Sequence, residues 1–180
     1  MGATVSQLLA PKPITVGLIG LNSAGKTTLV RKLSGNDAPV KPSVETVEIT
    51  EIYQANQQYK IFDYAGNPHW RPCWRSFMSR LQAVVFVIDS TDKQALQEAK
   101  IELAGLLKED MLETQPFLIL ANKQDEFRAM SVAAVTEYLD IHQYLDKPWK
   151  CCVQGASALT GAGLADGLQW VQKAVREGQK

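Results

Sequence analysis

A glycine-rich stretch near the start of the chain restricts the possible folds more than any other feature. Residues 20–27 read GLNSAGKT and match the pattern G-x-x-x-x-G-K-[ST] in full. The stretch follows an apolar run at residues 14–20 and opens a segment of helical spacing, which is the context that a phosphate-binding loop requires. The alternative is a chance glycine-rich turn with a surface lysine. We therefore expect a strand–loop–helix unit that binds a nucleoside triphosphate.

The residue types of this loop suit phosphate chemistry. Glycines allow backbone N–H groups to wrap phosphate oxygens at a helix N-terminus. Lys26 is expected to reach the β- and γ-phosphates, and the Thr27 hydroxyl is expected to ligate Mg²⁺. The residues expected to surround the phosphates are Gly20, Leu21, Asn22, Ser23, Ala24, Gly25, Lys26 and Thr27. The loop alone does not say which base the nucleotide carries.

Apolar runs that alternate with helical stretches predict an α/β fold. The runs lie at residues 14–20, 84–88 and 116–121, with a weaker one at 149–153. The run VVFVI at 84–88 is continuous, which is typical of a central parallel strand covered on both faces. The segments between the runs carry apolar stripes at helical spacing, formed by Leu96, Leu103 and Leu107 and by Leu164, Leu168, Val171 and Val175.

One early region departs from this alternation. Residues 44–52 partly alternate, polar residues follow at 54–57, and a second short run covers 59–63, which predicts a β-hairpin at a sheet edge. Pro11 and Pro13 interrupt any helix that precedes the first strand. We therefore expect an N-terminal segment and linker at residues 1–13, followed by one domain at 14–180. That domain is predicted to be a three-layer α/β fold with a mostly parallel sheet.

Composition narrows the classes of partner and compartment. Lys+Arg and Asp+Glu both total 19, so no net field favours nucleic acid. Cys73, Cys151 and Cys152 form an odd set without metal-ligand spacing. They predict reduced thiols in the cytoplasm, with the adjacent pair, Cys151 and Cys152, lying in a strand as small apolar residues.

A second motif follows the run at 116–121. Residues 122–125 read NKQD, and the Asp125 carboxylate can accept both donors on the N1/N2 edge of guanine, which adenine does not offer. Asn122 and Lys123 are expected to support the base and to tie back to the phosphate loop. The alternative is a solvated turn after a strand. About 100 residues after the phosphate loop and at a strand end, the motif predicts a guanine nucleotide.

Several stretches together resemble the Arf-like small GTPases of the Ras superfamily. They are the phosphate loop extended through Thr28, VETVE at 44–48, RPCWR at 71–75 and GLADGLQW at 163–170. The resemblance implies a six-stranded sheet, binding of GTP or GDP with Mg²⁺, and effector, exchange-factor and GTPase-activating partners. It also implies that Ser157, Ala158 and Leu159 form a loop whose backbone contacts the guanine oxygen.

The stretch DYAGN at 63–67 occupies the family's D-x-x-G-Q position. The resemblance implies that Asp63 holds Mg²⁺ through water and that the Gly66 N–H senses the γ-phosphate. The expected catalytic residues are Lys26, Gly66 and Asn67. Asn67 replaces the usual glutamine with a side chain one methylene shorter, so slow intrinsic GTP hydrolysis is expected. The alternative is that a partner repositions this segment and Asn67 still works.

The segment called switch I in this family, residues 35–43, departs more strongly from the pattern. It contains no threonine, and Ser43 is the hydroxyl that could take the place of the family's metal-binding threonine. If Ser43 does not serve, the protein is expected to be a guanine-nucleotide-dependent scaffold deficient in hydrolysis.

Two surface properties follow from the same resemblance. Phe62, Trp74 and Phe77 are expected to form an exposed apolar effector patch; the alternative is that they pack beneath the 63–80 segment. The start MGATVS fits M-G-x-x-x-[ST], so Gly2 is a candidate for myristoylation. A single acyl chain binds membranes weakly, so reversible, partner-assisted membrane association and a role in membrane trafficking are expected.

Overall fold

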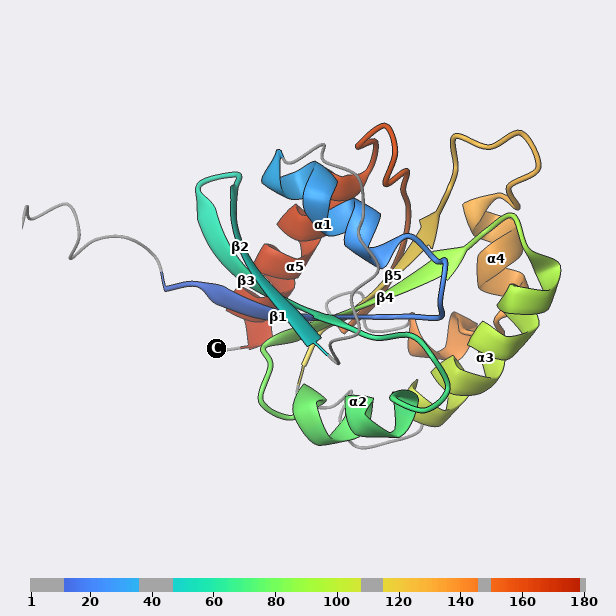
Figure 1. Cartoon of the computed structure of the whole chain (residues 1–180), viewed down its shortest axis with the longest axis horizontal. Helices are drawn as coiled ribbons and strands as arrows, with labels where there is room; N and C mark the ends of the chain where they lie inside the picture. Colours follow the sequence, from blue (N-terminus) through green and yellow to red (C-terminus); the bar gives the residue numbers. More distant parts are fainter. Residues whose placement is uncertain (1–11, 36–46, 108–114, 146–149, 179–180) are drawn as a thin grey trace, which may run out of the picture.

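The computed structural model describes residues 12–35, 47–107, 115–145 and 150–178. Its six-stranded sheet has the order β2-β3-β1-β4-β5-β6 (Figure 1). β2 runs antiparallel to β3, and every other neighbouring pair is parallel. This confirms the predicted sheet with its edge hairpin. The strands are β1 (Ile14–Ile19), β2 (Val47–Gln54), β3 (Gln57–Tyr64), β4 (Ala83–Asp89), β5 (Phe117–Asn122) and β6 (Cys151–Gly155).

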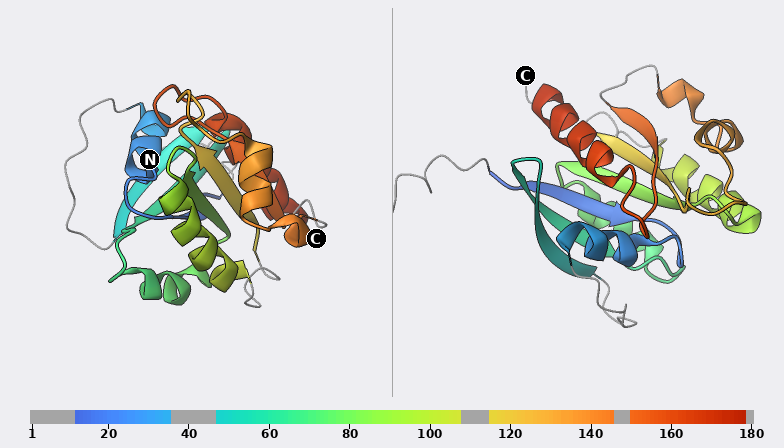
Figure 2. Two further views of the ribbon diagram at one scale, coloured as in Figure 1. Left: turned by 90° about the vertical axis from the view of Figure 1, so that its right-hand side faces the viewer. Right: turned by 90° about the horizontal axis from the view of Figure 1, so that it is seen from above.

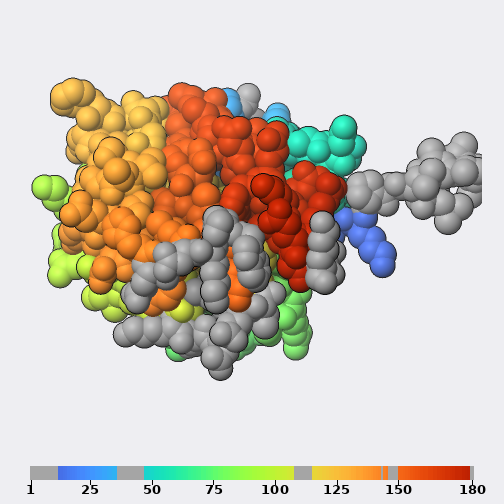
Figure 3. All heavy atoms as spheres, turned by 180° about the vertical axis from the view of Figure 1, so that it is seen from behind, coloured from blue at the N-terminus to red at the C-terminus, as the bar shows by residue number. Residues whose placement is uncertain are grey.

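Helices cover both faces of the sheet, which gives the predicted three layers. α1 and α5 lie on one face, and α2, α3 and α4 lie on the other (Figures 1 and 2). In the view from behind, α5 and the segments around α4 and β6 fill most of the surface (Figure 3). The helices are α1 (Lys26–Ser34), α2 (Arg71–Met78), α3 (Lys93–Leu107), α4 (Val132–Tyr138), the 3₁₀ helix η3 (His142–Tyr144) and α5 (Leu164–Gly178).

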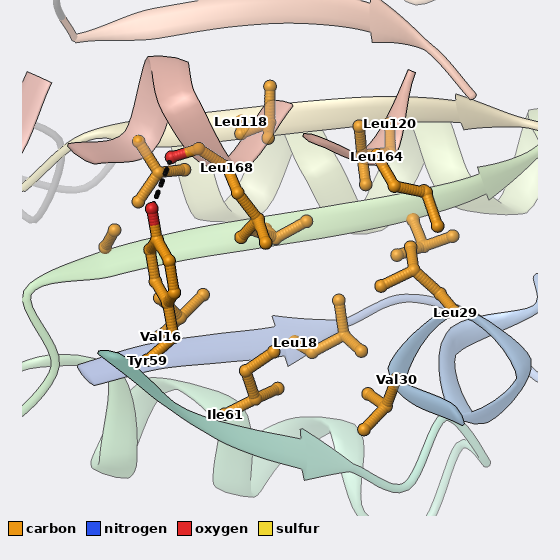
Figure 4. Packing of buried hydrophobic residues seen from close by; sticks show 14 of the residues in the cluster. Val16, Leu18, Leu29, Val30, Tyr59, Ile61, Leu118, Leu120, Leu164 and Leu168 are labelled. Atoms are coloured by element: carbon orange, nitrogen blue, oxygen red, sulfur yellow. Dashed lines mark hydrogen bonds between the residues drawn. The ribbon is translucent and has the colours of Figure 1, made fainter. Parts of the chain in front are cut away.

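The two faces of the sheet carry separate hydrophobic cores. Along β4, Val85 and Val87 belong to the core under α1 and α5, whereas Val84, Phe86 and Ile88 belong to the core under α2 and α3. A strand buried on both faces needs apolar residues at every position, which is why this run is continuous. Figure 4 shows the first core, where the Tyr59 hydroxyl donates to the Leu168 carbonyl at 3.0 Å.

The expected helical stripes are buried, including Leu96 and Leu103 on α3 and Leu168 and Val171 on α5. Cys151 and Cys152 lie in a strand, β6, as predicted; Cys151 is buried and Cys152 is partly buried. Burial raises the pKa of the Cys151 thiol to about 12. Within the part of the chain that the structure describes, no helix is both long and apolar enough to span a bilayer.

The parallel registry brings the predicted motifs to one edge of the sheet. Leu18 near the end of β1 pairs with Asp63 near the end of β3, and Asp89 pairs with Asn122 at the ends of β4 and β5. In open α/β sheets, ligands bind beyond the carboxyl ends of the strands. The loops that follow β1, β3, β5 and β6 therefore meet at a common site.

Candidate nucleotide site

The phosphate loop joins β1 to α1 in a conformation that requires glycine at two positions. Gly20 has φ 141° and Gly25 has φ 98°, both in the region that disfavours side chains. A Cβ on Gly20 would overlap the Val87 carbonyl oxygen, and one on Gly25 would overlap Asn122 Nδ2. Gly25 caps the start of α1, so the free N–H groups of the first helical turn open toward the loop.

Lys26 lies buried at the beginning of α1. Its Nζ donates to the carbonyl oxygens of Gly20 and Leu21, both at 3.0 Å. Burial lowers the pKa of Lys26, with a further lowering by Arg71, while the Asp63 carboxylate opposes the shift. The ammonium is thus fixed above the loop in a poorly solvated position, where an anionic phosphate would stabilise it.

Thr27 and Asp63 face each other across the loop. The Thr27 hydroxyl donates to Asp63 Oδ2 at 2.7 Å. Burial raises the pKa of Asp63 and Glu48 adds to this, while the Thr27 hydrogen bond and Lys26 act in the opposite direction.

A hydroxyl and a carboxylate are hard oxygen donors of the kind that Mg²⁺ accepts alongside water and phosphate oxygens. Among the described residues, no group of three or more His, Cys, Asp or Glu could hold a metal. This donor set fits an ion that a nucleotide brings with it. Ser43, the third predicted ligand, lies outside the described residues, as does Gly2.

A single amide ties three loops together at the predicted base end. Asn122 is 1% exposed; its Nδ2 donates to the Ala24 carbonyl at 2.7 Å, and its Oδ1 accepts from the Ala158 N–H at 2.8 Å. The predicted connection from Asn122 to the phosphate loop is therefore present. Ser157 and Ala158 are buried and Leu159 is exposed. The contact of these three residues with a base stays a prediction.

Lys123 and Asp125 occupy the loop after β5. Lys123 adopts φ 65°, and its Nζ donates to Asp89 Oδ2 at 2.5 Å. Although burial alone would raise the pKa of Asp89, the hydrogen bonds from Lys123 and Thr91 outweigh it, so this pKa is lowered. Asp125 is exposed. The lysine stem is thereby held beside the loop, and the carboxylate expected to read guanine is accessible.

Asn67, whose role in orienting water stays a prediction, is held in a local turn. Its Oδ1 and its carbonyl oxygen both accept from the Trp70 N–H, at 3.3 and 3.1 Å. The side chain therefore caps the turn that leads into α2. The spacing of three residues between Asn67 and Trp70, which directly precedes α2, was the available sequence signal. His69 is exposed, and its ring packs edge-on against Trp70.

The predicted effector patch is corrected at Trp74. This side chain is 1% exposed and its ring meets Phe86 of β4 edge-on. Trp74 shares the inner face of α2 with Arg71 and Met78 because the three residues follow helical spacing. Trp74 therefore packs beneath the helix, as the alternative interpretation held.

The other two aromatic residues of the patch are partly accessible. Phe77 is 42% exposed and stacks on Tyr64, and Phe62 is half-buried. Ile49 and Tyr53 on β2 are 52% and 66% exposed, and the sequence analysis missed both. Their alternation along an edge strand was the signal that could have identified them.

Arg71 is a second residue that the sequence analysis did not assign. It is buried, its Nε donates to the Gly66 carbonyl at 3.0 Å, and its Nη1 contacts Glu98 at 2.7 Å and Glu102 at 3.1 Å. Burial acts to lower the pKa of Arg71, but the two carboxylates raise it overall. Arg71 thus links the 65–67 turn to α3.

The comparisons with known proteins agree with this geometry. Residues 2–175 match the ADP-ribosylation factor family. The chain is 35% identical over 159 residues to ADP-ribosylation factor-like protein 3 of Chlamydomonas reinhardtii, covering 88% of this chain and 89% of that protein. It resembles the Arl6 BBS3 small GTPase of Trypanosoma brucei, solved with the nucleotide analogue GppNp. There the TM-score is 0.81 at 25% identity, covering 93% of this chain and 99% of the other. The chain therefore belongs to the ADP-ribosylation factor family of small GTPases.

Proposed function

We propose that this protein is an Arf-like guanine-nucleotide switch that binds GTP and GDP with Mg²⁺ and hydrolyses GTP slowly by itself. The observation that carries the proposal is the convergence of Lys26, Thr27 and Asp63 beside Gly66. A Cβ on Gly66 would lie 2.7 Å from Lys26 Nζ, so the expected sensor of the third phosphate sits next to the phosphate-binding lysine.

Different residues of the site would bind the phosphates, the metal ion and the base. Backbone N–H groups of the loop and of the first turn of α1 cradle the phosphates, and Lys26 neutralises the β- and γ-phosphates. Thr27 and Asp63, with Ser43 as the proposed third contact, would hold Mg²⁺, which spreads the charge that develops during phosphoryl transfer. Asp125 selects guanine, while Asn122 and the backbone of residues 157–159 shape the pocket of the base.

Hydrolysis transfers the γ-phosphoryl group from the β–γ bridging oxygen to water, which loses a proton. Asn67 occupies the sequence position of the family's water-orienting glutamine, yet its Oδ1 already accepts the Trp70 N–H. Its amide is also one methylene shorter than that of glutamine, and a small misplacement can cost about a hundredfold in rate. We infer that the unassisted protein hydrolyses GTP slowly and that a GTPase-activating protein accelerates it.

The exposed apolar residues beside the site suggest where effectors bind. Phe77 on α2, Ile49 and Tyr53 on β2, and the half-buried Phe62 on β3 form an accessible set that could anchor a partner. An exchange factor would act on the same region to release GDP. Myristoylation at Gly2 would add weak, reversible membrane association to a protein of the cytoplasm.

The second candidate is a guanine-nucleotide-dependent scaffold without significant hydrolysis. The hydrogen bond of Asn67 favours it, because a side chain engaged by the Trp70 N–H is withheld from the water. Single-turnover hydrolysis of GTP, followed as phosphate release from wild type and Asn67→Gln, separates the two. Turnover that rises in the variant supports the slow switch. Tight GTP binding without turnover in either protein supports the scaffold, and failure to bind GTP contradicts both.

A further inference from the structure

The 65–67 turn, which carries Gly66, receives hydrogen bonds from three donors in and before α2. Trp74 Nε1 donates to the Ala65 carbonyl at 3.0 Å, and Arg71 Nε donates to the Gly66 carbonyl at 3.0 Å. The Trp70 N–H donates to Asn67 Oδ1 at 3.3 Å. Trp74 and Arg71 of α2 thus hold the carbonyl groups of Ala65 and Gly66, so α2 fixes the orientations of two successive peptide groups.

The Trp74 bond also sets the direction of the Gly66 N–H. The Ala65 carbonyl and the Gly66 N–H belong to one planar peptide group, and the described residues contain no cis peptide bond. In a trans peptide the two groups point in opposite directions, so an indole that holds the carbonyl turns the N–H away from α2. Gly66 lies against the phosphate loop, since a Cβ there would overlap the Gly20 carbonyl oxygen and approach Lys26 Nζ.

The indole itself has little freedom to move. It is 1% exposed and packs edge-on against Phe86 in the core beneath α2. Arg71, one turn earlier, is held by Glu98 at 2.7 Å and Glu102 at 3.1 Å, two residues spaced four apart on α3. α2 is therefore fastened both to the sheet and to α3.

We propose that Trp74 is a positioning residue that directs the Gly66 N–H toward the third phosphate of GTP, with Arg71 and its two glutamates keeping α2 in place. The inference rests on the proposed function and assigns its selectivity for GTP over GDP to a buried indole. A merely structural role for Trp74 would weaken the binding of both nucleotides alike. A positioning role lowers the affinity for GTP relative to GDP.

The test compares Trp74→Phe, which keeps an aromatic ring but loses the N–H donor, with Trp170→Phe as the matched control. Trp170 lies on α5 and packs against the core on the other face of the sheet. Fluorescent GTP and GDP analogues are titrated in Mg²⁺, and hydrogen exchange of the Gly66 amide is measured in both complexes. We expect Trp74→Phe to lower the GTP-to-GDP affinity ratio about tenfold, the effect of losing one hydrogen bond. In wild type the Gly66 amide is expected to exchange more slowly in the GTP complex than in the GDP complex. Trp74→Phe is expected to lose this difference, and Trp170→Phe is expected to match wild type.

A folded Trp74→Phe variant with the wild-type affinity ratio and wild-type Gly66 exchange would overturn the inference. If that variant shows no cooperative thermal unfolding, the Glu98→Gln, Glu102→Gln double variant decides. It is expected to lower the ratio about threefold, and an unchanged ratio would overturn the inference. Wild type that binds GTP and GDP equally would also overturn it while leaving guanine-nucleotide binding intact. Wild type that binds neither nucleotide would overturn the proposed function and this inference with it.

Discussion

At the base end of the site one buried amide, that of Asn122, joins the phosphate loop to the loop after β6, whereas at the phosphate end the 65–67 turn takes its hydrogen bonds from α2. Asn122, at the end of β5, links backbone groups of the loops that follow β1 and β6, so its environment is part of the sheet edge. The 65–67 turn depends instead on a helix of eight residues that is fastened by side chains.

This difference suggests that one end of the site binds the nucleotide and the other end distinguishes GTP from GDP. A pocket built on strand ends can keep its shape whether two or three phosphates are bound. A turn carried by a short helix can shift together with that helix, and the exposed Phe77 moves with it. We therefore propose that the base end supplies affinity and guanine selectivity and that the phosphate end supplies switching.

The largest expected effect comes from Gly25→Ala, which places a side chain of the phosphate loop against Asn122 at the base end. A Cβ at Gly25 would meet Asn122 Nδ2, and the φ of 98° adds backbone strain. We expect guanine-nucleotide affinity to fall by at least about a hundredfold in calorimetric titration, because the clash and the strain together exceed about 3 kcal/mol. Gly35→Ala is the matched control: it has φ 69° but no neighbour within 4 Å. Its cost should be limited to about 1 kcal/mol of folding stability. Equal losses of nucleotide affinity in the two variants would contradict the account.

Asn122→Ala is expected to have the next largest effect. It leaves the Ala24 carbonyl and the Ala158 N–H buried without their partner. The free energy of unfolding should fall by about 2–4 kcal/mol in urea titration, and affinity for GDP and GTP should fall equally. Gln58→Ala removes an exposed amide from β3 and should change neither quantity. A loss confined to GTP would show that the base end also senses the third phosphate.

Asn67→Gln probes the phosphate end with a smaller change. The longer side chain is a poorer cap for the turn that precedes α2 but can reach further toward the attacking water. Single-turnover hydrolysis should accelerate about tenfold, with a loss of stability of about 0.5–1 kcal/mol from the weakened cap. Affinity for GDP should be unchanged. Slower hydrolysis in this variant would show that the cap matters more than the reach of the amide.

Asp89→Asn should have the smallest effect on the free energy of unfolding, and this effect should depend on pH. Because the pKa of Asp89 is lowered in the folded protein, its ion pair with Lys123 stabilises the fold above the unfolded pKa of about 3.9. That contribution disappears as pH falls through the folded pKa. At pH 7 the variant should lose about 1 kcal/mol or less, since the lysine is partly exposed. Urea unfolding at pH 7 and at successively lower pH follows this loss; a stability difference between variant and wild type that is independent of pH would refute the ion-pair explanation.

Much of the base end could be predicted from the sequence because its parts are local. The phosphate loop and the NKQD motif each follow a strand whose apolar run is unambiguous, and parallel strands bring such ends together. The phosphate end was harder to predict. Whether Trp74 faces the core or solvent depends on the rotation of α2, and two turns of helix provide too little periodicity to fix it.

The contacts of Arg71 with Glu98 and Glu102 join residues 27 and 31 positions apart. No local sequence pattern predicts that α2 and α3 make contact through these three side chains. The cap formed by Asn67 has a local signature, but the family's D-x-x-G-Q position suggested a catalytic role for the same residue. A side chain that fits two roles is assigned only when its hydrogen-bond partner is known.

The central claim, that this site binds guanine nucleotides and senses the third phosphate, is tested most directly by measuring the affinities of wild type for mant-GTP and mant-GDP with and without Mg²⁺. We predict tight binding of both nucleotides and a preference for GTP that depends on Mg²⁺. Equal affinities that do not respond to Mg²⁺ would contradict the claim that the site senses the third phosphate. Failure to bind either nucleotide would contradict the claim as a whole.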